Sequence, residues 1–255
     1  MEDHRIDISF SDYFDGIYII NLPSRIDRRK SIREELSALG LYERGGNIFI
    51  PDAPIFEDSG GFPTKGVRGN FYSHLQIIED AYDRGFERVL VLEDDAIFRS
   101  HLRRADYQNF VISKVEEYRW SMWFPGHFLT EHPDNAAKPV YQTTAGFKWA
   151  HCYAVHRRGM QALRDYLRLV GERPAGHPEG GKMYIDGALH HFRKQFVEQV
   201  CLISNPVLSI QKSSDTNLGE RQNAFHRGGV PFAKIFARYA KDELWRRTGF
   251  HLNLS

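Results

Sequence analysis

A buried strand that runs directly into three acidic residues is the strongest constraint in this sequence. Residues 86–98 read FERVLVLEDDAIF, in which the apolar run 89–92 is followed at once by Glu93, Asp94 and Asp95. Carboxylates a few ångströms apart repel one another, and burying them costs further free energy. The fold must therefore place something positive, from the chain or from a ligand, at this point.

The first hundred residues alternate between strand patterns and helix patterns. Residues 16–22 and 88–92 are continuous apolar runs, typical of strands buried on both faces of a sheet. Ser24 is the expected cap of the first helix and Gly40 its stop. The expected order is strand 16–22, helix 24–40, strand 47–55, loop 56–69, helix 70–85 and strand 88–92. This order predicts an α/β fold with a mostly parallel sheet flanked by helices.

The second half of the chain is less regular, and we expect no repeats in it. The expected elements are a helix over 101–118, a strand within 120–129, a loop or hairpin over 131–146, a strand over 149–156 with a helix to about 170, a helix over 184–196, a strand over 200–211 and an amphipathic basic helix over 230–247.

Composition narrows the class of protein. The net charge is +1, so no field of the whole protein points to nucleic acid. Cys152 and Cys201 are expected to be free, buried thiols of a reducing compartment. The N-terminal residues lack the apolar core of a signal peptide, and no apolar run approaches the ~18 residues of a membrane helix. A cytoplasmic protein is therefore expected.

The acidic triplet predicts a divalent cation. In open α/β sheets, ligands bind beyond the carboxyl ends of the strands, where this triplet lies. Alternate side chains of an extended chain share a side, so Glu93 and Asp95 are expected to converge while Asp94 points away. Two convergent carboxylates suit Mg²⁺ or Mn²⁺, which prefer oxygen ligands and bridge to diphosphates. The alternative is three solvated acids paired with arginines.

Four blocks occur in a characteristic order along residues 16–215. They are IYIINLPSRIDRR, TKGVRGNFYSHLQIIEDAYDRGFERVLVLEDDA, FKWAHCYAVHRRGMQAL and YIDGALHH. Together they resemble glycosyltransferase family 25, which includes bacterial lipooligosaccharide galactosyltransferases and the collagen galactosyltransferases. The resemblance implies a GT-A fold, a nucleotide-sugar donor, usually a metal ion, and transfer with inversion at the anomeric carbon. It also marks Glu-Asp-Asp as the counterpart of the DxD motif, with Glu93 and Asp95 on the metal.

The length of 255 residues predicts one large domain over 1–255, or one domain with a long insertion. Its parts are a nucleotide-sugar-binding half at about 16–100, an acceptor half at about 101–215, and a closing segment with a C-terminal amphipathic helix at about 216–255. The tail helix is expected to pack on the domain, and contact with an anionic membrane surface is the alternative.

The donor site is expected around the first strand and the helix after it. A phosphate there would meet free backbone N–H groups and the guanidinium groups of Arg28 and Arg29, unless these form only a solvated basic face. Asp52 is placed to accept hydrogen bonds from a base or ribose, or is a turn residue. The expected donor-site residues are Asn21, Leu22, Arg28, Arg29, Asp52, Ser73, His74 and Asp94.

An inverting transfer needs a carboxylate that takes the acceptor's proton, and Asp186 is the candidate. Its alternative role is a helix N-cap. Trp149, His151 and Tyr153 alternate along one expected strand, where they stack on the acceptor sugar or fill the core. The segment after the last strand is expected to close over the donor and add a third metal ligand, for which the candidates are Gln211, Ser213, Asp215 and His226.

The expected function is transfer of a hexose, galactose from UDP-galactose, to a saccharide, a lipid-linked saccharide or another hydroxyl acceptor, as in lipopolysaccharide biosynthesis. Two other classes stay open. A nucleotide-sugar-binding protein would keep the fold without catalysis, and a nucleotide-sugar hydrolase would use the same donor site with water as the acceptor.

Overall fold

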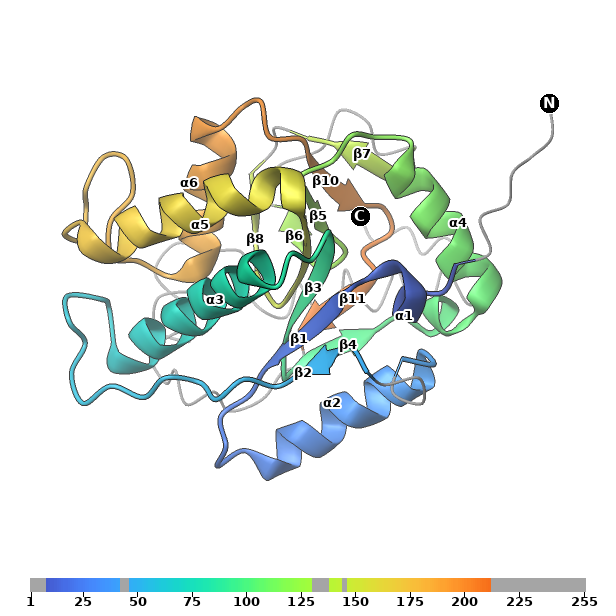
Figure 1. Ribbon diagram of the computed structural model, residues 1–255, viewed down its shortest axis with the longest axis horizontal. Coiled ribbons are helices and arrows are strands. Elements are labelled where there is room, and N and C mark those ends of the chain that lie inside the picture. Colours follow the sequence, from blue (N-terminus) through green and yellow to red (C-terminus); the bar gives the residue numbers. More distant parts are fainter. Residues whose placement is uncertain (1–7, 42–45, 130–137, 144–145, 212–255) are drawn as a thin grey trace, which may run out of the picture. The chain divides into compact units, whose positions relative to one another are not determined.

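The computed structural model describes residues 8–41, 46–129, 138–143 and 146–211 (Figure 1). The chain divides into two compact units, Met1–Ser214 and Asp215–Ser255. All described residues belong to the first unit. The predicted closing segment and C-terminal helix, with Ser213, Asp215 and His226, lie outside the described residues.

A central sheet of seven strands forms the middle of the described part of the chain, in the order β2-β1-β3-β9-β5-β10-β7. Strand β1 is parallel to β2 and β3, and β10 is parallel to β5, whereas β9 and β7 run antiparallel to their neighbours. Five of these described strands therefore point the same way, which confirms the predicted α/β class with a mostly parallel sheet. Their bounds are β1 Gly16–Ile20, β2 Ile48–Phe49, β3 Arg88–Glu93, β5 Met122–Phe124, β7 Val140–Gln142, β9 Cys152–His156 and β10 Cys201–Ser204.

Helices cover both faces of this sheet (Figure 1). Helix α3 packs on β1 and β3, and α5 and α6 pack against α3. Helices α1, α2 and α4 contribute to the core on the other face. The bounds are α1 Phe10–Tyr13, α2 Ile26–Ala38, α3 Lys65–Asp83, η1 Ser100–Arg103, α4 Ala105–Glu116, α5 Arg157–Glu172 and α6 Ile185–Gln195. None of the described helices is both long and apolar enough to cross a bilayer.

Because both faces are covered, alternate residues of each strand are buried on opposite sides. In β3, Leu90 and Leu92 belong to the core shared with α2 and α4, while Val89 and Val91 are buried on the α3 side. This is why the strand carries an unbroken apolar run. The same alternation carries forward to Glu93, which faces α3.

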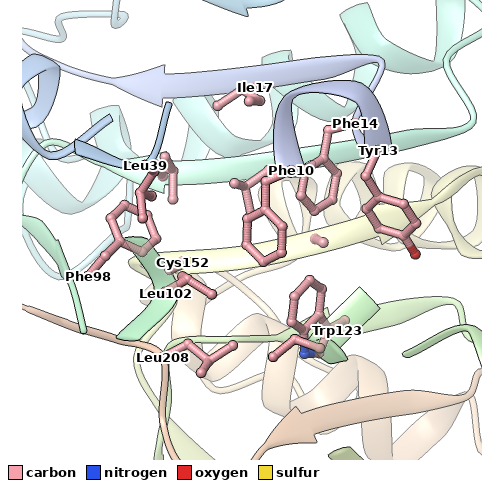
Figure 2. Close-up of a cluster of buried hydrophobic side chains, with 14 of the residues drawn as sticks. Phe10, Tyr13, Phe14, Ile17, Leu39, Phe98, Leu102, Trp123, Cys152 and Leu208 are labelled. Carbon is pink, nitrogen blue, oxygen red and sulfur yellow. The ribbon is translucent and has the colours of Figure 1, made fainter. Parts of the chain in front are cut away.

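Aromatic rings fill the core on the α1 side (Figure 2). Phe14 stacks on Trp123 with ring centroids 6.4 Å apart, and Phe10 meets the same indole edge-on at 5.9 Å. Phe10 is the first residue of a helix of only four residues, and Phe14 is the C-cap of that helix. Because so short a helix is marginal by itself, we infer that this packing holds it in place. Cys152 belongs to this core, and both it and Cys201 are free and buried, as predicted.

Two helix starts differ from the sequence prediction. The N-cap of α2 is Arg25 and not Ser24, and it makes no side-chain capping bond. Helix α3 begins at Lys65, five residues before the predicted start, because the hydroxyl of Thr64 accepts a hydrogen bond from the N–H of Val67 at 3.1 Å. The predicted stop at Gly40 is confirmed, since this glycine has φ +72° just after the helix.

The second half contains shorter elements than predicted. The expected helix over 101–118 is divided into η1 and α4 at Arg104, and the expected strand over 149–156 begins only at Cys152. Trp149 has φ 77°, a left-handed conformation that an extended strand does not contain. Two small sheets complete the described fold, β11 (Ser209–Gln211) with β4 (Ala96–Phe98) and β6 (Phe128–Leu129) with β8 (Phe147–Lys148).

Gln108 of α4 provides a test of how the N-terminal half is held together. Its side-chain oxygen accepts from the N–H of Phe10 at 3.1 Å, and its amide donates to the carbonyls of Leu39 at 3.1 Å and Leu102 at 2.9 Å. Replacing it with leucine keeps the volume and leaves three buried backbone groups unpaired. We expect Gln108→Leu to lower the free energy of unfolding in urea by about 3 kcal/mol or more. Gln142→Leu, on an exposed position, is the control; equal stability of the two variants would refute this role.

Candidate active site

The acidic triplet lies where three segments of the chain meet. Glu93 is the last residue of β3, pairs in register with Ile20 of β1, and donates its N–H to the carbonyl of His151 at 2.8 Å. Asp94 and Asp95 form the turn into β4. The triplet therefore lies at the carboxyl ends of β1 and β3, the edge at which ligands of open α/β sheets bind.

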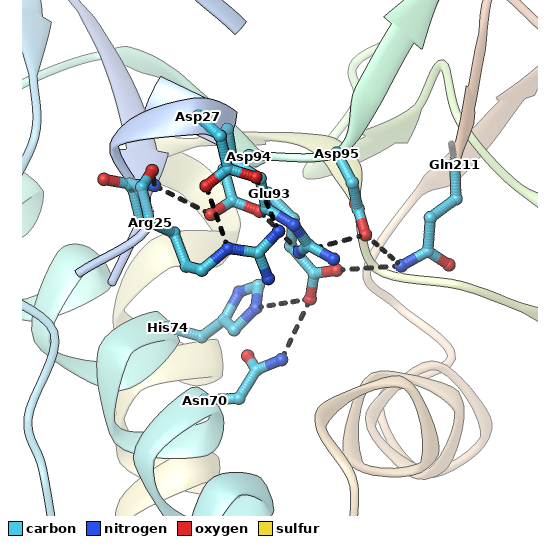
Figure 3. Close-up of polar contacts among 10 residues, drawn as sticks. Arg25, Asp27, Asn70, His74, Glu93, Asp94, Asp95 and Gln211 are labelled. Carbon is cyan, nitrogen blue, oxygen red and sulfur yellow. Dashed lines mark hydrogen bonds and ion pairs between the residues drawn. The ribbon is translucent and has the colours of Figure 1, made fainter. Parts of the chain in front are cut away.

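The three carboxylates separate as predicted (Figure 3). Glu93 and Asp95 converge on the side-chain amide of Gln211, whose nitrogen lies 3.3 Å from Oε2 of Glu93 and 3.1 Å from Oδ2 of Asp95. Asp94 turns the other way and accepts hydrogen bonds from Asn21 at 2.8 Å and from Arg28 at 2.9 Å. The predicted convergence of the two outer acids is thus confirmed, whereas the binding of a metal by them stays a prediction.

Asp95 is the most constrained of the three. It is 5% exposed, and its Oδ1 is buried without a hydrogen-bond partner in the described part of the chain. Burial, together with the nearby negative charge of Glu93, raises the pKa of Asp95 to about 7, although Gln211 and Arg28 oppose the shift. Nη1 of Arg28 lies 3.6 Å from Oδ2. The charged form of Asp95 therefore needs more positive charge than its described neighbours supply.

These groups fit a hard divalent cation. The buried, unpartnered oxygen of Asp95 is the kind of atom that a cation would satisfy, and it lies beside a second carboxylate. Among the described residues, no group of three or more His, Cys, Asp or Glu side chains is arranged to hold a metal. One or two carboxylates are nevertheless sufficient for Mg²⁺ or Mn²⁺ when phosphate oxygens and water complete the shell. Glu93 and Asp95 would hold such an ion, with Gln211 beside both.

Glu93 is supported from α3 by residues one helical turn apart. Asn70 donates to its Oε1 at 3.0 Å, and Nε2 of His74 lies 3.5 Å from the same oxygen. Nδ1 of His74 in turn lies 2.9 Å from the hydroxyl of Tyr153, and the two rings stack with centroids 5.6 Å apart. Because His74 is 0% exposed, it is a positioning residue behind Glu93.

The donor-site role predicted for Ser73 and His74 therefore needs correction. The hydroxyl of Ser73 donates to the carbonyl of Gly69 at 3.0 Å within the helix, and both residues are buried. Neither lines a surface that a donor reaches. Asn70, which no motif in the sequence marks, donates a hydrogen bond to Glu93 from this helix. Its spacing of four from His74 was the available signal, because such residues share a helix face.

The acceptor-side prediction is wrong for two of its three residues. His151 and Tyr153 are 0% exposed, and burial lowers the pKa of His151 to about 4, so it is held neutral inside the protein. Burial likewise raises the pKa of the Tyr153 hydroxyl. Only Trp149 is partly exposed, and its ring lies 5.3 Å from that of Phe128 and 5.7 Å from that of His151. Neither His151 nor Tyr153 is placed to stack on a sugar.

The predicted donor side differs in accessibility from residue to residue. Asn21 is 1% exposed and forms a parallel backbone bridge with Asp52, which is exposed. The side chain of Asn21 accepts a hydrogen bond from Arg29 at 2.9 Å. Arg28 keeps 16% of its side chain exposed beside Asp94, and Leu22 is partly exposed. Asn21 and Asp94 are thus internal supports, while Leu22, Arg28, Arg29 and Asp52 are reachable.

Asp186 lies in the first turn of α6, which packs against α3. The N-cap of this helix is Tyr184, so the alternative role of Asp186 as the cap is wrong. One of its two carboxylate oxygens accepts a hydrogen bond from the N–H of Gly187 at 2.9 Å, and the residue is partly exposed. Its predicted role as a general base stays a prediction.

Two solved structures align with most of the chain at low similarity. A glycosyltransferase involved in the glycosylation of the major capsid of PBCV-1 covers 84% of this chain and 100% of its own, with a TM-score of 0.47 and 12% identity. A UDP-glucose pyrophosphorylase complexed with UDP-glucose covers 83% of this chain and 81% of its own, with a TM-score of 0.41 and 11% identity. At these scores the alignments establish nothing about activity.

Curated relatives share more sequence over a shorter stretch. The inactive glycosyltransferase 25 family member 3 of Homo sapiens is 28% identical over 172 residues, which are 59% of this chain. Procollagen galactosyltransferase 2 of Mus musculus is 27% identical over 188 residues, or 64% of this chain, and procollagen galactosyltransferase 1 of Danio rerio is 26% identical over 170 residues, or 59%. The chain spans only 28% of the length of each of these relatives.

A family model covers the part of the chain that carries the acidic triplet. Residues 57–173 match glycosyltransferase family 25, described as an LPS biosynthesis protein family. This stretch contains α3, β3, β9 and α5, and with them Asn70, His74 and the triplet. The resemblance of this chain to glycosyltransferase family 25 is thereby confirmed, and residues 57–173 are the part that matches the family.

Proposed function

We propose that this chain is a metal-dependent, inverting glycosyltransferase that moves a hexose, galactose from UDP-galactose, to a hydroxyl acceptor. The observation that carries the proposal is the convergence of Glu93 and Asp95 beside the buried, unpartnered Oδ1 of Asp95. Supporting it, this pair lies in the stretch that matches glycosyltransferase family 25, and two relatives are named procollagen galactosyltransferases. The acceptor is a saccharide, lipid-linked or free, or another hydroxyl compound.

In this proposal, the donor's diphosphate binds between the start of α2 and the acidic triplet. Arg28 and Arg29 lie at the start of α2, where the N-cap contributes no side-chain hydrogen bond and backbone N–H groups favour an anion. Arg28 also contacts Asp94 and Asp95, so it places positive charge between the acids and this helix start. A divalent cation held by Glu93 and Asp95 supplies stabilisation of the negative charge that develops on the leaving nucleoside diphosphate.

The proton of the acceptor hydroxyl goes to a carboxylate in an inverting displacement, and we assign this role to Asp186. Its place in the first turn of α6 keeps it on a separate element from the acidic triplet. Separation is required because the nucleophile attacks from the side opposite the leaving diphosphate, so a base beside the cation would lie on the wrong side. The bond to Gly187 holds one carboxylate oxygen and orients the other.

A nucleotide-sugar-binding protein without transfer activity is the second candidate. Relatives named as inactive family members favour it, since they match the chain as well as the named galactosyltransferases do. A nucleotide-sugar hydrolase would use the same groups with water as acceptor. Incubation of the protein with UDP-galactose and Mn²⁺, with and without a saccharide acceptor, separates these. A transferase gives a glycosylated acceptor. A hydrolase gives free galactose whether or not the acceptor is present, and a binding protein gives neither product.

Removal of the Asp95 charge should abolish transfer without unfolding the protein. Asp95→Asn keeps the volume of the side chain, and burial already disfavours its charged form, so the melting temperature should not fall. We expect transfer to drop by at least ~10²-fold, because charge stabilisation at a leaving group is commonly worth that much. Asp83→Asn, at an exposed position, is the control. Activity of Asp95→Asn near that of the wild type in the presence of a chelator would disprove metal dependence.

Binding of UDP should depend on a divalent ion and on Glu93. In calorimetry, the wild type should bind UDP more tightly with Mn²⁺ than with EDTA, because an ion held by Glu93 and Asp95 would attract the diphosphate. Glu93→Gln, which keeps the shape and lowers the charge, should lose most of this difference. Equal UDP affinity of the wild type with and without Mn²⁺ would count against a bridging metal.

Asp186→Asn tests the general base. The amide keeps the size of the side chain and its hydrogen bond to Gly187, but it takes up no proton. General-base assistance contributes about 10²–10⁴-fold, so the transfer rate should fall by that order while UDP affinity and the melting temperature stay unchanged. A variant with normal turnover but a much lower melting temperature would show instead that Asp186 serves only the stability of α6.

A further inference from the structure

Gln211 occupies a defined position beside the acidic turn. It is the last residue of β11, which pairs antiparallel with β4 so that Gln211 stands opposite Ala96. Ala96 directly follows Asp95 in the sequence. The backbone pairing therefore places this glutamine next to Asp95, although more than a hundred residues separate them along the chain.

The Gln211 amide joins the two convergent carboxylates with one group. Its nitrogen donates to Glu93 at 3.3 Å and to Asp95 at 3.1 Å, as the dashed lines in Figure 3 show. A side-chain amide has two N–H donors on its nitrogen and an acceptor on its oxygen. One N–H for each carboxylate uses both donors. The nitrogen thus sits at the point from which a cation shared by Glu93 and Asp95 would also reach both oxygens.

A cation and an NH₂ group at one point exclude each other, because both require the same carboxylate oxygens. A half-turn of the terminal torsion exchanges the nitrogen and the oxygen of the amide, which have nearly the same size. Without a cation, an amide oxygen turned towards the two carboxylates would be repelled by their negative charge. With a cation between the carboxylates, the same oxygen is a ligand of the kind that Mg²⁺ and Mn²⁺ accept. The orientation of the amide is therefore linked to the presence of the cation.

We propose that Gln211 is a cation-responsive ligand of this site. Its NH₂ group bridges Glu93 and Asp95 when no divalent ion is held, and its carbonyl oxygen becomes the third protein ligand when one is. The inference rests on one part of the proposed function, the binding of a divalent ion by these carboxylates. Glu93 and Asp95 belong to one segment of the chain, so Gln211 adds a ligand from a second segment and links ion binding to the end of β11.

The experiment measures Mn²⁺ binding directly by calorimetry, in the protein without any sugar nucleotide. Gln211→Ala removes the oxygen, and we expect its Mn²⁺ affinity to fall about tenfold or more, as for loss of other groups that tune a metal site. Gln211→Glu keeps an oxygen at this position and adds charge, so its affinity should equal or exceed that of the wild type. Gln142→Ala, on an exposed position of β7, should bind as the wild type does.

The outcomes separate this inference from the proposed function. If the wild type binds neither Mn²⁺ nor Mg²⁺, the divalent site is absent. The ligand role of Gln211 and the metal dependence of the proposed function are then both overturned. A wild type that binds Mn²⁺, with Gln211→Ala binding as tightly or more tightly, leaves the divalent site standing and overturns the ligand role of Gln211. Tighter binding in particular would mean that the amide only competes with the ion.

Reorientation of the amide has its own readout. In a ¹⁵N-labelled protein, the side-chain NH₂ signals missing from Gln211→Ala identify those of Gln211 in the wild type. Addition of Mg²⁺, which is diamagnetic, should shift these signals because both hydrogen bonds to carboxylates are lost, while the side-chain signals of Gln142 stay in place. Gln211 signals unchanged at saturating Mg²⁺ would contradict the proposal even if the affinities agreed.

Discussion

Repulsion between Glu93 and Asp95 is the constraint on which the rest of this site depends. A buried strand delivers two carboxylates to one place, where burial penalises their charge and each raises the cost of the other. In the described fold, donors from three separate segments contact these carboxylates, namely Asn70 from α3, Arg28 from α2 and Gln211 from β11. The site therefore exists only when these segments are assembled around the end of β3.

The alternation of β3 decides which acid receives which partner. Glu93 continues the face of the sheet that packs on α3, and there it meets His74, which is fixed by Tyr153 from the neighbouring strand β9. Asp94 falls on the opposite side and ties β3 to Asn21 at the end of β1. Two acids thus serve different purposes although they are adjacent. One stands at the candidate cation site, and the other fastens the edge of the sheet.

Three histidine and tyrosine side chains near the site lie inside the protein and have no surface on which a ligand could bind. His74, His151 and Tyr153 are fully buried, and burial holds His151 neutral. Such groups orient the residues that are exposed and exclude water from behind them. The same arrangement serves a transferase or a nucleotide-sugar-binding protein, because both need Glu93 and Asp95 held in one geometry.

The α/β class, the convergence of Glu93 and Asp95 and the family resemblance could all be predicted from the amino-acid sequence, because they follow from local periodicity and from motifs contiguous in the chain. The burial of His151 and Tyr153 is visible only in the assembled fold, since a strand pattern does not say which face of the strand a helix covers. The left-handed backbone of Trp149, which shortens β9, likewise has no signal in the residue type. The choice of Gln211 as neighbour of the carboxylates depended on the pairing of β11 with β4. Such long-range pairing depends on how the whole domain packs, so the residues of the two strands do not predict it.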